Sequence, residues 1–159
     1  MFGKDTQEKT PTDVNELIQS VLGLVYIDLR KHSVETQMNL GEQLPSVIVN
    51  EVQLRQVILN LVMNAIEAMN ATERRVLSIK SENTGHNSIR VSIEDTGSGI
   101  DPSHIDHMFK PMFTTKTRGM GMGLAICRSI IESHGGKIWV SAGASRGSIF
   151  QFELPTNGH

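Results

Sequence analysis

Two amides and a carboxylate are spaced to share one face of a predicted helix. Asn60, Asn64 and Glu67 occupy positions i, i+4 and i+7, and side chains with this spacing lie on the same side of an α-helix. The apolar residues of this helix form one broad stripe on the opposite side, which consists of Leu54, Val57, Ile58, Leu61, Val62, Ala65 and Met69. Amide and carboxylate oxygens can bind a hydrated divalent cation together with phosphate oxygens. A solvated polar face has the same pattern, so both readings stay open here.

Two glycine-rich segments could approach a ligand closely. The first is Asp95-Thr96-Gly97-Ser98-Gly99-Ile100, directly after a predicted strand, where glycines admit a flat ligand and Asp95 offers an acceptor to a base amino group. A plain turn with an Asp cap is the alternative. The second is Gly119-Met120-Gly121-Met122-Gly123 at the start of a predicted helix, where free N–H groups and the helix dipole favour an anion. The second segment matches neither a Rossmann fingerprint nor a Walker A loop.

The composition is that of one globular domain. The chain has 159 residues, of which 38% are hydrophobic, and its formal net charge is −2, so we expect a single core and no non-specific binding to nucleic acid or acidic lipid. Cys127 is the one cysteine, which excludes an internal disulfide and a CxxC metal site. We expect a cytoplasmic domain without membrane contact, whose full-length parent could be membrane-anchored.

Hydrophobic periodicity places these segments in an α/β sandwich. It predicts helices over 13–31, 51–69 and 121–134, and strands over 34–40, 47–49, 76–83, 88–95, 137–142 and 148–154. We expect a flexible arm over 1–11, the domain over 12–155 and a short tail over 156–159. This order favours an α+β fold, a two-layer sandwich with one mixed sheet of about five strands under about three helices. We expect Cys127 and Trp139 in the core.

Together the segments resemble the nucleotide-binding domain of the superfamily that groups gyrase, Hsp90, MutL and histidine kinases, whose fold is the Bergerat type. Asn60–Asn64 resembles its N box, Asp95–Ile100 its G1 box and Gly119–Gly123 its G2 box. Met108–Lys116 resembles the F box of sensor histidine kinases. The phrase from Asn60 to Met69 and the Phe-Thr-Thr-Lys tail are most similar to the nitrogen- and oxygen-sensing branch of these kinases.

The resemblance implies ATP and Mg²⁺ as cofactors. Asp95 would accept a hydrogen bond from the exocyclic amine of adenine, whereas guanine would present its own acceptor there, so ATP is favoured over GTP. Asn64 would ligate Mg²⁺ with Asn60 beside it, and Lys116 would join these two in catalysis. Further nucleotide contacts would come from Gly97, Gly99, Ile100, Phe113, Thr115, Lys116, Arg118, Gly119, Gly121, Gly123 and Leu124.

Asn60 directs the predicted reaction away from hydrolysis. Hydrolysing members of the superfamily carry a Glu one helical turn before the Mg²⁺-binding Asn, and an amide cannot take a proton from water. We therefore expect phosphoryl transfer to an acceptor on another domain. The resemblance implies that this acceptor is a histidine on a separate helical dimerisation domain, with a response regulator downstream. His32 is followed by Ser33-Val34-Glu35 and lacks the family's acceptor pattern, so we expect the acceptor outside this chain. The alternatives are an ATPase module of the gyrase and Hsp90 type and a degenerate nucleotide-binding docking domain.

Overall fold

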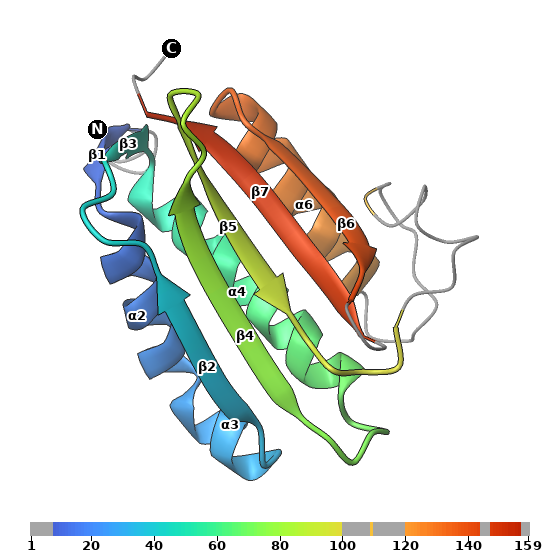
Figure 1. Cartoon of the computed structure of the whole chain (residues 1–159). Coiled ribbons are helices and arrows are strands. Elements are labelled where there is room, and N and C mark those ends of the chain that lie inside the picture. The colour runs from blue at the N-terminus through green and yellow to red at the C-terminus, as the bar shows by residue number, and fades with distance from the viewer. Residues whose placement is uncertain (1–7, 100–108, 110–119, 144–146, 157–159) are drawn as a thin grey trace.

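Five strands form one mixed sheet with helices on one face (Figure 1). A computed structural model describes residues 8–99, 109, 120–143 and 147–156. In spatial order the strands are β2 (Glu35–Leu40), β4 (Val76–Asn83), β5 (Ser88–Glu94), β7 (Ser148–Pro155) and β6 (Lys137–Ala142). The pairing of β2 with β4 is parallel and the other three pairings are antiparallel. The predicted α+β sandwich with a five-stranded mixed sheet is confirmed.

The helical layer covers the apolar face of this sheet. It consists of α2 (Val14–Leu24), α3 (Tyr26–Lys31), α4 (Glu51–Ala68) and α6 (Met120–Ser133). Alternate side chains of β5 and β7 point toward the helices, because successive residues of a strand face opposite sides. The core residues of these two strands are Ile89, Val91, Ile93, Phe150, Phe152 and Leu154.

Local sequence signals set where the two long helices begin and end. Asn50 caps α4, and its side-chain oxygen accepts the Gln53 N–H at 2.9 Å, which satisfies an otherwise free donor of the first turn. After α6, Gly135 has a left-handed φ of 77°, as glycine commonly does at a helix end. A Cβ on Gly136 would lie 2.1 Å from the Glu153 carbonyl oxygen, so α6 can turn into β6 this close to β7 only with glycine there.

The N-terminal region differs from the prediction in two ways. Thr10 and Pro11, expected in the flexible arm, belong to β1 (Thr10–Thr12), which pairs antiparallel with β3 (Val47–Val49) in a separate two-stranded ribbon. A polar three-residue edge strand has no alternating apolar pattern, so periodicity misses it. The predicted helix over 13–31 is divided at Val25 into α2 and α3, after Gly23, whose helix propensity is low.

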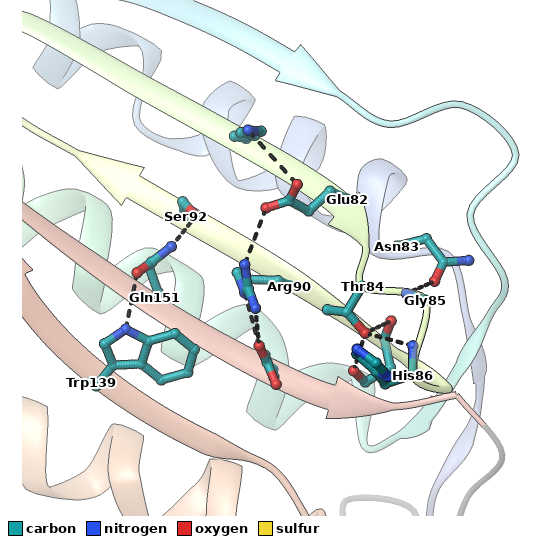
Figure 2. Close-up of polar contacts among 12 residues, drawn as sticks. Glu82, Asn83, Thr84, Gly85, His86, Arg90, Ser92, Trp139 and Gln151 are labelled. Carbon is teal, nitrogen blue, oxygen red and sulfur yellow. Dashed lines mark hydrogen bonds and ion pairs between the residues drawn. The ribbon is translucent and has the colours of Figure 1, made fainter.

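Trp139 is not a core residue. Its neighbour Val140 is buried, so Trp139 faces the open side of the sheet, where its indole N–H donates to Gln151 Oε1 at 2.9 Å (Figure 2). Cys127 is buried as predicted. None of the helices in the described part of the chain is both long and apolar enough to span a bilayer.

Candidate nucleotide-binding site

Asp95 is a buried carboxylate at the carboxyl end of β5. Only 1% of its surface is exposed, and its backbone N–H donates to the Ser148 carbonyl oxygen at 3.0 Å. Its Oδ1 accepts the Gly97 N–H at 2.8 Å, and its Oδ2 accepts the Ser148 hydroxyl at 2.9 Å. Because a carboxylate has about four lone-pair sites, these two bonds orient the group and leave capacity for donors from a ligand.

Burial has the largest effect on the pKa of Asp95. Desolvation raises the pKa of this carboxyl, while the donors from Gly97 and Ser148 act in the opposite direction and the neighbouring Glu94 adds a smaller increase. A buried carboxyl group whose pKa is raised by desolvation is typical of binding and catalytic sites.

Two glycines bring backbone against this carboxylate. A Cβ on Gly97 would lie 2.4 Å from the Ala68 carbonyl oxygen, and a Cβ on Gly147 would lie 1.8 Å from the Asp95 carbonyl oxygen. Both distances are far inside van der Waals contact, so any larger residue would displace the Asp95 loop. Gly99 has a left-handed φ of 89°, which glycine adopts without strain.

Thr96 ties the loop after β5 to the end of α4. Its hydroxyl donates to the Arg74 carbonyl oxygen at 2.7 Å and accepts the Val76 N–H at 3.0 Å. Arg74 lies between α4 and β4, and Val76 is the first residue of β4. The loop that carries Asp95 is therefore anchored to the segment that follows the helix carrying Asn60 and Asn64.

The two amides of α4 are half-buried, and Asn60 lies against α6. Asn60 Nδ2 lies 3.8 Å from Cys127 Sγ and would lie 3.6 Å from a Cβ on Gly123, so Asn60 faces α6 and is not part of a simply solvated surface. Asn64 is one turn further toward Ala68, the residue that Gly97 touches. Buried Val62 and Ile66 fix the opposite side of α4 in the core.

The predicted site residues on α6 fall in its first turns. Gly121 and Gly123 belong to the helix, and Gly123 is the position at which α6 approaches Asn60. The Leu124 side chain packs in the core with 2% exposed, so only its backbone could meet a ligand. Six predicted residues lie outside the described residues: Ile100, Phe113, Thr115, Lys116, Arg118 and Gly119.

Ser148 and Gly147 are site residues that sequence reasoning missed. Gly147 lies between the two predicted strands over 137–142 and 148–154, and Ser148 begins the second of them. Only the pairing of β5 with β7 brings both residues to Asp95. A Gly-Ser pair entering a strand gives no sequence signal of its own. Phe109 packs against the core, with its ring centroid 6.1 Å from that of Phe150.

A hollow of about 620 Å³ on the open face of the sheet is a poor phosphate site. Two cations line it, and both are already paired. Lys80 lies 3.7 Å from Glu82, and Arg90 lies 3.6 Å from Glu82 and 2.6 Å from Glu153, as Figure 2 shows for the Glu82 side of Arg90. Asp95 directly follows the carboxyl end of β5 and does not line this hollow. Within the described ranges, no group of three His, Cys, Asp or Glu side chains is arranged to hold a metal.

Comparison with known proteins gives one consistent family. The family model described as histidine kinase-, DNA gyrase B- and HSP90-like ATPase matches residues 49–158. The chain is 43% identical over 155 residues to the sensor protein TdiS of Thauera aromatica, covering 96% of this chain and 28% of that protein. It is 39% identical over 148 residues to the sensor protein FixL of Bradyrhizobium diazoefficiens, covering 93% of this chain and 29% of that protein. The chain thus spans less than a third of either relative.

Solved structures of histidine kinases share the fold. The nucleotide-free catalytic domain of histidine kinase ThkA aligns with a TM-score of 0.84 at 38% identity, covering 94% of this chain and 96% of that one. ThkA in complex with the response regulator protein TrrA aligns with a TM-score of 0.82 at 35% identity, covering 96% and 43%. Full-length ShkA in complex with AMPPNP aligns with a TM-score of 0.80 at 27% identity, covering 92% and 31%.

Proposed function

From the premise that this chain belongs to the histidine kinase-, DNA gyrase B- and HSP90-like ATPase family, we propose that it binds Mg²⁺·ATP and transfers the γ-phosphoryl group to a histidine on a separate dimerisation domain. The observation that carries the proposal is the buried Asp95 carboxylate, held by Gly97 and Ser148 at the end of β5. A buried acceptor of this kind suits the exocyclic amine of adenine.

The glycines around Asp95 let the backbone pack closely against its loop. Gly97 and Gly147 have no room for a Cβ, so a larger residue at either position would displace the carboxylate that is proposed to accept the adenine amine. Guanine would present its O6 acceptor to the Asp95 acceptor and leave both without a partner, which discriminates strongly in a buried site. ATP is therefore preferred to GTP.

Asn64 and Asn60 are the proposed ligands on the phosphate side. Both are half-buried amides on α4, and amide oxygens suit Mg²⁺, which is usually held by few protein oxygens together with phosphates and water. The ion would neutralise charge on the phosphates and fix their geometry. Lys116, with Arg118, is proposed to add positive charge to the triphosphate, and Phe113, Thr115, Gly119, Gly121 and Gly123 to surround it.

Asn60 favours transfer over hydrolysis. It occupies the position from which a Glu would activate water, and its amide lies against Cys127 and Gly123 of α6. Because an amide cannot act as a general base at neutral pH, the domain is suited to positioning and charge neutralisation, which are the main requirements of phosphoryl transfer. The acceptor domain would supply its own base.

We propose two partners for the domain. One is the helical dimerisation domain that carries the acceptor histidine, and the other is a downstream response regulator, the class of protein found with ThkA. His32 ends α3, with its Nδ1 2.9 Å from the Asp28 carbonyl oxygen, and is not proposed as the acceptor. The domain would act in the cytoplasm, where ATP is available.

Calorimetry and a labelling reaction test the proposal. The chain is titrated with ATP and with GTP, each with and without Mg²⁺, and is then mixed with γ-labelled ATP and the acceptor domain of its parent kinase. We expect Mg²⁺-dependent affinity for ATP, weaker affinity for GTP and label on a histidine of the acceptor domain. Steady hydrolysis near 1 s⁻¹ or faster, within the usual range of enzyme turnover of about 1–10³ s⁻¹, would support the ATPase alternative, and absence of ATP binding would support the docking module.

A further inference from the structure

His134 is a buried imidazole for which the proposed reaction has no use. It follows the last residue of α6 and is 8% exposed. Its Nδ1 lies 2.7 Å from the Ile130 carbonyl oxygen, and its Nε2 accepts the backbone N–H of Asn50 at 3.0 Å. A carbonyl only accepts and an amide N–H only donates, so the ring is neutral with its proton on Nδ1.

The bond to Asn50 joins opposite ends of the two helices that carry site residues. Asn50 is 2% exposed and is the N-cap of α4, so a variant without the imidazole removes the acceptor that His134 gives to a buried N–H, which is destabilising. His134 is the first residue beyond α6. At the same corner, Lys9 Nζ donates to the Ser133 carbonyl oxygen at 3.0 Å.

The order of the contacts between α4 and α6 shows how the two helices run relative to each other. Going back along α6 from His134, the Cys127 thiol lies 3.9 Å from the Val57 carbonyl oxygen and 3.8 Å from Asn60 Nδ2. Gly123 then meets Asn60. The helices are therefore antiparallel, and the bond at His134 fixes the same register that places Gly123 against Asn60.

We propose that His134 is a positioning residue for the nucleotide site, because its bond to the Asn50 N–H sets the register in which Asn60 of α4 meets the first turns of α6. The proposal rests on the proposed function for its nucleotide readout. A one-residue shift between packed helices is a discrete change, since close-packed surfaces interlock. Loss of the His134 bond therefore changes the position of Asn60 relative to Gly123, although neither residue is substituted.

Three substitutions separate this role from a local one at the end of α6. His134→Gln places an acceptor near the position of Nε2 and keeps the bond to Asn50. His134→Asn places a donor near the position of Nδ1 and keeps only the bond to Ile130 within α6. His134→Phe removes both bonds and keeps the ring. Leu29→Ala in α3 is the matched control, because it removes buried apolar surface away from the α4–α6 contact.

The first measurement is Mg²⁺·ATP affinity by calorimetry, well below the melting temperature of every variant. We expect His134→Gln and Leu29→Ala to bind like the wild type, and His134→Asn and His134→Phe to bind more weakly by about two- to thirtyfold, the range of couplings transmitted through packed residues. Wild-type affinity in His134→Asn, or a loss in His134→Gln equal to that in His134→Phe, would overturn the proposal.

The second measurement needs no nucleotide. Amide resonances of Gly123 and of the Asn60 side chain should shift in His134→Asn and His134→Phe and remain in place in His134→Gln. Unshifted resonances in all three variants would overturn the role of His134. Failure of the wild type to bind ATP would instead overturn the proposed function, and the resonances would still decide the role of His134.

The pH profile adds a third readout. Protonation puts a hydrogen on Nε2, which then faces the Asn50 N–H, so the acceptor is lost. Burial lowers the pKa of His134 below its ordinary 6.5, the bond to the Ile130 carbonyl acts in the opposite direction, and the positive charge of Lys9 lowers the pKa further. We expect wild-type affinity to fall more steeply than that of His134→Gln only when the pH drops below this lowered pKa, and identical profiles would contradict the proposal.

Discussion

Asp95→Asn should separate the function of this carboxylate from its effect on stability. The amide has the same shape, and its oxygen can still accept the Gly97 N–H that now meets Oδ1 at 2.8 Å. Its NH₂ group would face the Ser148 hydroxyl, now 2.9 Å from Oδ2, and that hydroxyl can rotate to accept. The loop should therefore keep its conformation.

The loss of affinity can be estimated from the bond that disappears. A hydrogen bond to a charged group contributes about 1.5–3 kcal/mol, which corresponds to about a 10- to 150-fold change in affinity. If the amide NH₂ points at the adenine amine, two donors face each other and the loss lies at the upper end. We therefore expect Mg²⁺·ATP to bind at least about tenfold more weakly to the variant.

The stability of Asp95→Asn should not fall with its ATP affinity. Burial raises the pKa of Asp95 above its ordinary 3.8, so the folded protein binds the proton more tightly than the unfolded chain does. Between these two pKa values the free energy of unfolding falls as the pH rises, and at neutral pH the buried charge is destabilising. The variant lacks this titration, so its melting temperature at pH 7.5 should equal or exceed that of the wild type, with the difference shrinking on acidification.

Calorimetric titration and thermal unfolding from pH 4 to 8 measure both effects. Glu94→Gln is the control, since it removes the same charge from the adjacent residue, whose side chain faces the open side of the sheet; its affinity should stay within about twofold of the wild type. Unchanged ATP affinity in Asp95→Asn would remove Asp95 from the nucleotide site. A melting temperature more than about 10 °C below the wild type would mean that the carboxylate is structural.

Further substitutions test the neighbouring groups. Asn64→Ala should abolish Mg²⁺-dependent transfer to a supplied acceptor domain at a nearly unchanged melting temperature; labelling at the wild-type rate would exclude Asn64 as a metal ligand. Gly147→Ala should lower the melting temperature by about 2–12 °C and weaken ATP binding, because its Cβ would lie 1.8 Å from the Asp95 carbonyl oxygen; a variant that melts and binds like the wild type would refute this. Ser148→Ala removes one donor to Asp95, so it should weaken ATP binding less than Asp95→Asn does. His134 has a pKa below its ordinary 6.5, so the unfolded chain takes up its proton first, and melting curves should show stability falling as the pH drops below 6.5, more in the wild type than in His134→Gln.

The parts of the fold that repeat a pattern were predictable from sequence. β4 over 76–83 and β6 over 137–142 have the predicted bounds, because alternation reports which side of a strand is buried. β3 over 47–49 was also predicted with its observed bounds, but its partner β1 was missed, because backbone pairing of a polar strand leaves no apolar pattern. Trp139 was placed in the core by its residue type, but its register on an edge strand turned it to the open face.

By itself, the sequence determined which chemical groups this protein has and where each lies along its elements. Asn60 and Asn64 share a helix face, and Asp95 ends a strand, because such placements follow from the period of an element. Tertiary structure alone decided which groups meet. Ser148 reaches Asp95 through the pairing of β5 with β7, and His134 reaches Asn50 across 84 residues of chain, because contacts between distant segments depend on the register of packed elements, which no local pattern encodes.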